Sequence, residues 1–269
     1  MDNNIEALQT TENGIVAPSW NIIPEPDISH LVTEDDEPVD NVFSAKQQRL
    51  LIETLYSNTA LWNPPERTFL ADANVGIFAS TKEPPLVPDA FVSVDVPIEA
   101  NFDFEKVRAY FAWVFGKMPE IVVEIVSNRK GGEMLRKMNE YARLHIPYYA
   151  VFDPFRLLRG DTFTLYVLHG GKYQAHGDFW IEEVGAGLRL WEGEYEEMTA
   201  TWLRWCDERG NIFPTGKVRA EQEKARADEE KARADEEKMR AEQEKTRADQ
   251  AEEYARQLAD KLRALGIEP

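Results

Sequence analysis

Cysteine is almost absent from this sequence of 269 residues, which contains only Cys206. A single cysteine excludes an intrachain disulfide framework and is typical of proteins from a reducing compartment. The N-terminus also lacks a basic region ahead of a long apolar run, because Pro18 and Asn21 interrupt the apolar residues between Ile15 and Ile23. The sequence therefore predicts neither a signal peptide nor a membrane span, and we expect a cytoplasmic protein.

Positive charge is scarce at the start of the chain. The net charge is −18 at pH 7, no lysine or arginine occurs before Lys46, and acidic residues crowd positions 25 to 40. Phosphate binding draws on clustered lysine and arginine, so the overall charge excludes a general polyanion binder and leaves only local contacts with nucleic acid. Residues 1–40 also contain several prolines and no sustained hydrophobic period, which predicts an extended acidic N-terminal arm.

Several enzyme signatures are missing as well. The histidines show no zinc-ligand spacing and no cysteine cluster accompanies them; they are His30, His145, His169 and His176. The sequence contains no Gly-x-Ser-x-Gly elbow, no phosphate-binding loop and no dinucleotide fingerprint. These absences argue against zinc enzymes, serine hydrolases of the elbow type and nucleotide-dependent enzymes.

The patterns that are present alternate between helical and strand-like periods. Hydrophobic residues make up 43% of the chain and include seven tryptophans, enough for one substantial domain. The predicted elements are a helix over 44–57 with a capping box at Ser44, strands over 68–79, 86–94 and 121–126, a helix after Gly131-Gly132, a strand over 148–152, strand-like segments over 162–167 and 172–191, and a helix over 196–208 with Trp202 and Trp205. This order predicts an α/β domain over residues 41–210.

From about Lys217 the sequence repeats in sevens without proline or glycine until Gly266. Opposite charges recur four residues apart, as in Arg226 with Glu230, which predicts a helix over 217–265. The apolar positions of each repeat lie two apart, on nearly opposite sides of a helix, so the repeat has no coiled-coil seam. The last turns differ, because an apolar stripe joins Ala251, Tyr254, Leu258, Leu262 and Leu265. Residues 251–265 either meet a partner helix, as in a homo-oligomer, or form a solvated helix with an apolar end.

Two carboxylates stand in otherwise apolar strand segments. Asp89 follows Pro88, and Glu124 lies in the middle of the run from Ile121 to Val126. A buried carboxylate needs a partner or a metal ion. If the two strands are neighbours, the oxygen ligands suit Mg²⁺. The alternative is that Glu124 caps a helix or pairs with an arginine.

Lys137 and Tyr141 are four residues apart, on one face of the helix that follows the Glu124 strand. A lysine beside a metal site can polarise the nucleophilic water and neutralise charge that develops on a phosphate. A single lysine on an amphipathic helix is more often a solvated side chain. The combination of strand carboxylate, loop, helix lysine and helix tyrosine is more specific than any one of them.

The order of several short motifs resembles a known family. The motifs are Val87-Pro-Asp-Ala90, the segment from Ile121 to Ser127, Lys137 to Tyr141, His145 to Tyr149, and Val151 to Pro154. Together they resemble the Uma-two-type restriction endonuclease family of bacteria, a branch of the PD-(D/E)xK nuclease superfamily. The acidic entry over 33–41 and the repetitive charged tail are similar to that family too, and the resemblance covers roughly residues 30 to 205.

The resemblance implies a fold with a central mixed sheet flanked by helices, as in restriction endonucleases. It also implies a hydrolase activity, the cleavage of DNA phosphodiester bonds with Mg²⁺ or Mn²⁺. The family's metal-binding aspartate and glutamate correspond to Asp89 and Glu124.

The sequence departs from the superfamily pattern at one position. That pattern expects lysine two residues after the glutamate, where this chain has Val126. The resemblance then points to Lys137 on the helix as the catalytic lysine, and Lys130 on the loop is the second candidate. Ser127 and Tyr141 are the expected supporting residues.

Two other classes of function stay open at this point. The domain can be a catalytically inactive binding or assembly module that uses the C-terminal helix for protein interaction, a reading that Val126 and the acidic surface favour. A scaffold protein built around the charged helix is the third reading, and it leaves Asp89 and Glu124 unexplained. Catalysis requires both carboxylates within reach of one metal ion, with the Lys137 amine nearby, so geometry separates these readings.

Overall fold

The computed structural model describes residues 41–97, 108–127, 131–158 and 160–264. The predicted N-terminal arm and Lys130 lie outside these residues. The helices are α1 (Val42–Ser57), α2 (Thr59–Trp62), α4 (Ala112–Phe115), α5 (Gly131–Arg143) and α6 (Gly216–Ala264). The strands are β1 (Phe69–Asp72), β2 (Ile77–Phe78), β3 (Ala90–Val94), β4 (Tyr110–Phe111), β5 (Ile121–Ile125), β6 (Tyr148–Phe152), β7 (Phe163–His169), β8 (Lys172–Ala175), β9 (Trp180–Ile181), β10 (Ala186–Tyr195) and β11 (Met198–Cys206).

A central mixed sheet has the strand order β1-β3-β5-β6-β7-β8. Its only parallel pair among the described strands is β5 with β6, and α5 is the crossover between them. The other neighbours in this sheet pair antiparallel. The predicted fold class, a mixed α/β sheet flanked by helices and followed by a long C-terminal helix, is confirmed.

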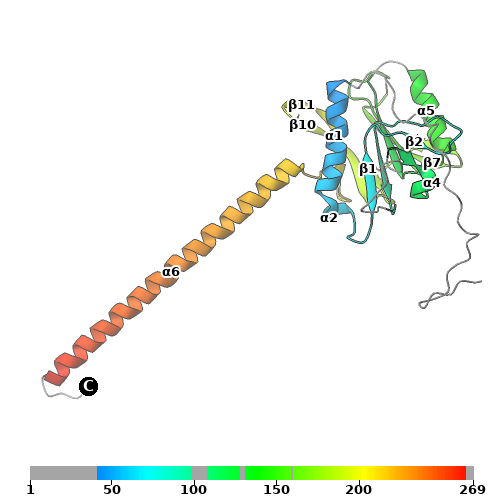
Figure 1. Cartoon of the computed structure of the whole chain (residues 1–269). Helices are drawn as coiled ribbons and strands as arrows, with labels where there is room; N and C mark the ends of the chain where they lie inside the picture. Colours follow the sequence, from blue (N-terminus) through cyan, green and yellow to red (C-terminus); the bar gives the residue numbers. More distant parts are fainter. Residues whose placement is uncertain (1–40, 98–107, 128–130, 159, 265–269) are drawn as a thin grey trace, which may run out of the picture.

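The sheet lies between α1 on one face and α5 on the other (Figure 1). The alternation along β5 follows from strand geometry: Val123 packs in the cluster that contains Leu51 of α1, whereas Val122 packs in the cluster that contains Tyr141 of α5. Glu124 lies two residues after Val122, so its side chain is on the same face of the strand and faces α5. Both faces of β5 are covered, which explains why the segment is apolar apart from this carboxylate.

The start of α1 differs from the sequence prediction. The helix begins at Val42, and its N-cap is Asn41, whose side-chain oxygen accepts a hydrogen bond from the Ser44 backbone N–H at 3.0 Å. The capping box expected at Ser44 is therefore wrong by one turn. Asparagine is an equally good N-cap, and Ser44 itself is buried.

The helix predicted over 196–208 is wrong, because most of these residues form the strand β11. This strand pairs with β10 through nine residue pairs, and together with β9 they make a second sheet on the outer side of α1. Trp202 and Trp205 are buried, and the Trp205 indole N–H donates to the Leu51 carbonyl oxygen. The two strands are joined by Glu196 and Glu197, which both have positive φ, as a two-residue hairpin turn requires.

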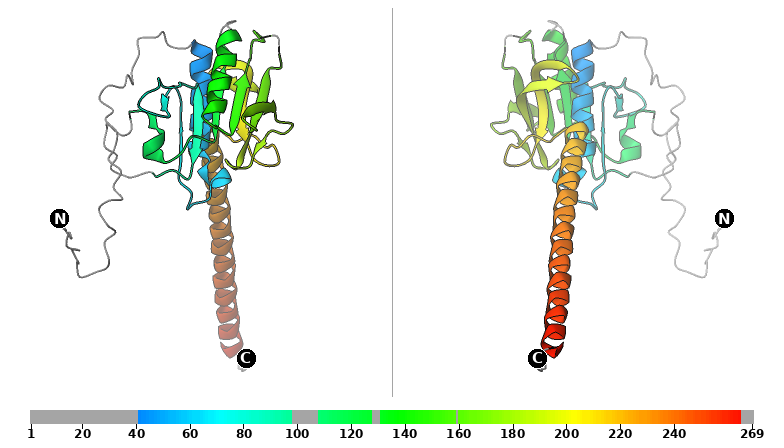
Figure 2. Two further views of the ribbon diagram at one scale, coloured as in Figure 1. Left: turned by 90° about the vertical axis from the view of Figure 1, so that its right-hand side faces the viewer. Right: turned by 90° about the vertical axis from the view of Figure 1, so that its left-hand side faces the viewer.

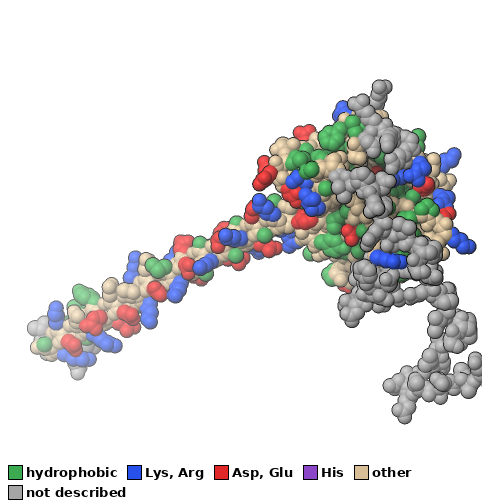
Figure 3. All heavy atoms as spheres, turned by 45° about the horizontal axis from the view of Figure 1, so that its top comes forward, with side chains coloured by type: hydrophobic (Ala, Val, Ile, Leu, Met, Phe, Trp, Pro, Cys, Tyr) green, Lys and Arg blue, Asp and Glu red, His purple; other side chains and the backbone are tan. Residues whose placement is uncertain are grey.

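The last element, α6, confirms the predicted C-terminal helix. It projects from the domain as a single straight helix (Figure 2). None of its residues is buried, and lysine and arginine alternate with aspartate and glutamate along its surface (Figure 3). In the described part of the chain, no helix combines the length and the apolar character needed to cross a membrane.

Candidate active site

The site lies where β3, β5 and α5 meet. The antiparallel register pairs Ala90 of β3 with Val123 of β5, which places Asp89 beside Glu124 at the same end of the two strands. Glu124 is only 4% exposed, and Asp89 is half-buried. The structure thus brings together the two carboxylates that the sequence singled out.

The Glu124 carboxylate is held by two side chains of α5. The Lys137 amine lies 3.0 Å from Oε1 and 2.9 Å from Oε2, and the Tyr141 hydroxyl donates to Oε1 at 2.7 Å. Lys137 also donates to the Val87 carbonyl oxygen at 3.1 Å, which ties α5 to the segment before Asp89. The helical spacing of four residues puts Lys137 and Tyr141 on the face that covers the sheet.

Asp89 is positioned from the opposite side. Its Oδ2 accepts a hydrogen bond from the Ile125 backbone N–H at 2.5 Å, which extends the β3–β5 pairing by one step. Its Oδ1 accepts from the side-chain amide of Gln48 at 2.9 Å. Gln48 is fixed in turn by Asn74, whose amide donates to the Gln48 side-chain oxygen at 3.0 Å. Groups from α1, β5 and the loop after β1 therefore determine where this carboxylate lies.

The electrostatics of the site centre on Glu124. Burial and the nearby Asp89 charge raise the pKa of Glu124 to about 7, although Lys137 and Tyr141 oppose this shift. Burial and the adjacent Glu124 charge raise the pKa of Tyr141 well above its usual value, so Tyr141 is a neutral hydrogen-bond donor at neutral pH. The Asp89 charge thus opposes ionisation of Glu124, and a cation placed between the two carboxylates would relieve this repulsion.

The donor set fits a hard divalent cation. Mg²⁺ uses oxygen ligands, keeps several waters and takes one or two protein carboxylates, and Asp89 and Glu124 provide two on adjacent strands. Among the described residues, no group of three or more His, Cys, Asp or Glu side chains could hold a metal ion. A site that requires three protein ligands, as zinc does, is not formed by these residues.

The other residues that the sequence analysis considered for the site lie at or just after the end of β5. Val126, at the usual lysine position, is 4% exposed and follows the end of β5, where its backbone N–H donates to the Phe152 carbonyl oxygen. Ser127 is exposed at the following position. Lys130 lies outside the described residues, so its expected role as the second candidate is untested. Lys137, the lysine that the sequence favoured, contacts Glu124.

Sequence reasoning missed two contributors to the site. Gln48 is 5% exposed on the core-facing side of α1, and the Val87 carbonyl accepts from Lys137. A signal for Gln48 was present: Gln47 and Gln48 continue the stripe that leads to Leu51 and Leu55, and a polar side chain on a buried stripe needs a partner. No sequence signal marks a backbone carbonyl.

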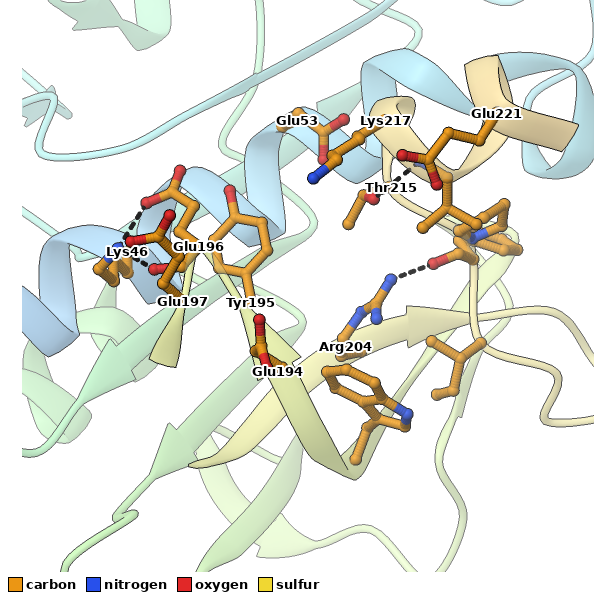
Figure 4. A pocket seen from close by; sticks show the side chains of 15 residues that line it. Lys46, Glu53, Glu194, Tyr195, Glu196, Glu197, Arg204, Thr215, Lys217 and Glu221 are labelled. Atoms are coloured by element: carbon orange, nitrogen blue, oxygen red, sulfur yellow. Dashed lines mark hydrogen bonds and ion pairs between the residues drawn. The ribbon is translucent and has the colours of Figure 1, made fainter. Parts of the chain in front are cut away.

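A separate pocket of about 1010 Å³ lies away from this site. It opens between α1, the β10–β11 hairpin and the first turn of α6, and its walls include Tyr195, Arg204 and Lys217 (Figure 4). None of its lining residues belongs to the Asp89–Glu124 cluster. This pocket and the Asp89–Glu124 cluster are therefore separate features of the domain.

Comparison with known proteins agrees with the geometry. A search of curated proteins found no match. The model of the Uma2 family, described as "Putative restriction endonuclease", matches residues 32–190, more than half of the chain. The match contains Asp89, Glu124, Lys137 and Tyr141, and it ends before β11 and α6. The chain therefore belongs to the Uma2 family and has a nuclease-type fold.

Proposed function

We propose that this protein is a divalent-metal-dependent endonuclease that hydrolyses DNA phosphodiester bonds. The observation that carries the proposal is the meeting of Asp89, Glu124 and Lys137 at one end of adjacent strands. Membership of a restriction endonuclease family suggests DNA as the substrate. We place the activity in the cytoplasm, where the single thiol, the buried Cys206, stays reduced.

Asp89 and Glu124 are the residues that would hold Mg²⁺ or Mn²⁺ in this mechanism. When bound, the ion supplies Lewis acidity that activates water and the scissile phosphate. Gln48 and the Ile125 N–H fix the direction of the Asp89 carboxylate, and Tyr141 fixes that of Glu124. Such preorganisation removes reorganisation from the reaction step.

Lys137 supplies the charge that the superfamily takes from the lysine at the Val126 position. Its side chain is 20% exposed, so it is accessible from solvent while it remains bound to Glu124. A phosphate that approaches the two carboxylates would meet this amine, which can donate a hydrogen bond to an oxygen whose negative charge increases during hydrolysis. A cation is needed locally because the whole chain is strongly acidic.

Calorimetric titration with Mn²⁺ tests the metal site. The unmutated protein should bind the ion, and Asp89→Asn should abolish binding. Asp95→Asn is a matched control, since Asp95 follows the other end of β3 and its side chain is 66% exposed. Equal binding by the Asp89 variant would place the metal elsewhere.

Conversion of supercoiled plasmid to nicked or linear DNA tests the activity. The unmutated protein should cleave with Mn²⁺ or Mg²⁺ and stop when a chelator is added. Absence of cleavage on both single- and double-stranded DNA, at protein concentrations that bind the metal, would refute the nuclease proposal and favour the inactive binding module.

A further inference from the structure

The final turns of α6 carry a hydrophobic pattern that the rest of the helix lacks. Ala248, Ala251, Ala255, Leu258 and Leu262 follow one another at alternating spacings of three and four. This is the a/d pattern of a coiled-coil seam. In the sequence a further leucine, Leu265, follows at the next spacing of three and lies outside the described residues.

Nothing in the part of the chain that the structure describes buries this seam. No residue of α6 is buried, Leu258 is 48% exposed, and the flanking Tyr254 is 68% exposed. At 1.5 Å per residue the helix is about 70 Å long, so its end lies far from the domain. An isolated helix gains little stability without packing, and a contiguous apolar stripe favours association.

We propose that residues 248–262 form a parallel coiled coil with the same segment of a second copy of this chain. The charged residues beside the seam favour a second copy of the chain, in parallel orientation, as the partner. With Ala248 and Ala255 at a positions, Arg247 occupies a g position and Glu252 the next e position. In a parallel pair, g faces e of the following heptad, so Arg247 of each chain faces Glu252 of the other.

The charges also exclude other arrangements. An antiparallel pair centred on the same seam does not bring Arg247 opposite Glu252. If the parallel pair continued upstream in the same register, Glu244 would occupy a d position and face Glu244 of the other chain. Arg240 would face Lys245 of the other chain, so both contacts would be repulsive. Glu230 and Glu237 occupy the preceding d positions. The coiled coil therefore ends near Ala248, and the upstream helices separate toward their domains.

Sedimentation velocity of the full-length protein over a range of concentrations tests the association. We expect a concentration-dependent dimer, and Leu258→Glu should leave only monomer. Met239→Glu is the matched control, because Met239 is 57% exposed on the same helix but outside the seam. A monomeric unmutated chain, an unaffected Leu258 variant or an equally disrupted Met239 variant would overturn the proposal.

A charge exchange tests the partner and the orientation. Arg247→Glu should weaken the dimer on the order of tenfold, since it puts two like-charge pairs at the interface. The double variant Arg247→Glu/Glu252→Arg should restore it. Leu258→Cys should also form a disulfide with its own copy under mild oxidation, whereas Met239→Cys should not. Failure of the double variant to recover, or absence of the cross-link in the Leu258→Cys variant, would overturn the parallel pairing.

Discussion

The ion pair inside the domain and the ion pairs along α6 use the same kinds of side chain in opposite environments. The Glu124 and Lys137 side chains are 5% and 20% exposed, whereas those of Glu229 and Arg233 are 64% and 76% exposed. Water compensates for the loss of a partner on α6 but not inside the domain. Charged pairs inside the domain therefore fix the geometry of a site, whereas those along α6 keep the helix solvated.

Lys137→Ala should have the largest effect on function. Loss of a preorganised cation should lower the rate of metal-dependent DNA cleavage by about 10²–10³, by analogy with the loss of an oxyanion donor. Mn²⁺ affinity should be retained or increase, because the amine is not a ligand and contacts both Glu124 oxygens. Cleavage rates and calorimetric titration measure the two quantities on the same preparation.

Two control variants accompany Lys137→Ala. Arg136→Ala removes the neighbouring exposed cation of α5, which pairs with Glu140, and should cleave normally. Lys130→Ala should also retain cleavage. Full activity of Lys137→Ala beside an inactive Lys130→Ala would transfer the catalytic role to the loop.

The affinity for Mn²⁺ should decrease as the pH falls below about 7. The pKa of Glu124 is raised to about 7 by burial and by Asp89, so a proton competes with the metal below that pH. Where one proton is displaced, the affinity should decrease about tenfold per pH unit. Titrations between about pH 5.5 and about pH 8 check this slope. A constant affinity across the range would contradict the role of Glu124 as a ligand.

The raised pKa of Glu124 should also make the stability of the metal-free protein decrease as the pH rises. Because the folded-state pKa of Glu124 lies above the ordinary value of 4.5, the folded chain binds more protons than the unfolded chain between those two values. Its contribution to stability is therefore lost as the pH rises through about 7. Urea unfolding of Glu124→Gln, compared with the unmutated protein, should show a smaller decrease in stability over this window.

Truncation of α6 should have a small effect that depends on the cut. The first turn contacts α1, because Arg219 donates to the Ser57 carbonyl and the Gly216 N–H donates to Glu53. A chain that ends after Ala225 keeps these contacts and should retain its thermal midpoint. A chain that ends after Gly216 loses the Arg219 contact, worth about 1 kcal/mol, and should unfold roughly 2–4 °C lower. Equal midpoints for both would show that the contact contributes nothing.

Arg233→Ala should have the smallest effect. Its pair with Glu229 spans four residues on an exposed helix and is worth roughly 0.2–0.5 kcal/mol. Far-ultraviolet circular dichroism should detect at most a slight loss of helix, and the thermal midpoint of the domain should not change. A shift of the domain midpoint by several degrees would mean that the exposed pairs are not equivalent to ordinary surface pairs.

Much of the domain could be predicted from the sequence because its elements follow simple periods. The alternation along β5 places Glu124 on the side that faces α5. The spacing of four places Lys137 and Tyr141 on one face of α5, and both contact Glu124. Gln48 was missed because its function depends on a long-range contact with Asp89, which no local pattern encodes.

The error at β11 originates in the turn that precedes this strand. Two-residue hairpin turns normally contain asparagine or glycine, but here Glu196 and Glu197 adopt positive φ. Lys46 and Arg49 of α1 bind Glu196, and these ion pairs lower its pKa to about 2. The turn is thus stabilised by a distant helix, and the unbroken buried run from Trp202 to Cys206 lacks the alternation that marks a strand.

Val126 is buried at the position where the superfamily pattern has lysine. Val126 lies two residues after Glu124, on the same side of the chain, so an amine can approach this carboxylate either from the strand or from α5. A lysine introduced at position 126 would place a second amine beside Lys137 near the Glu124 carboxylate. The repulsion between the two cations should lower the cleavage rate. In a chain that already carries Lys137→Ala, the same Val126→Lys change should act as an intragenic suppressor and restore part of the cleavage rate. No recovery in the double variant would show that the site accepts its cation only from the helix.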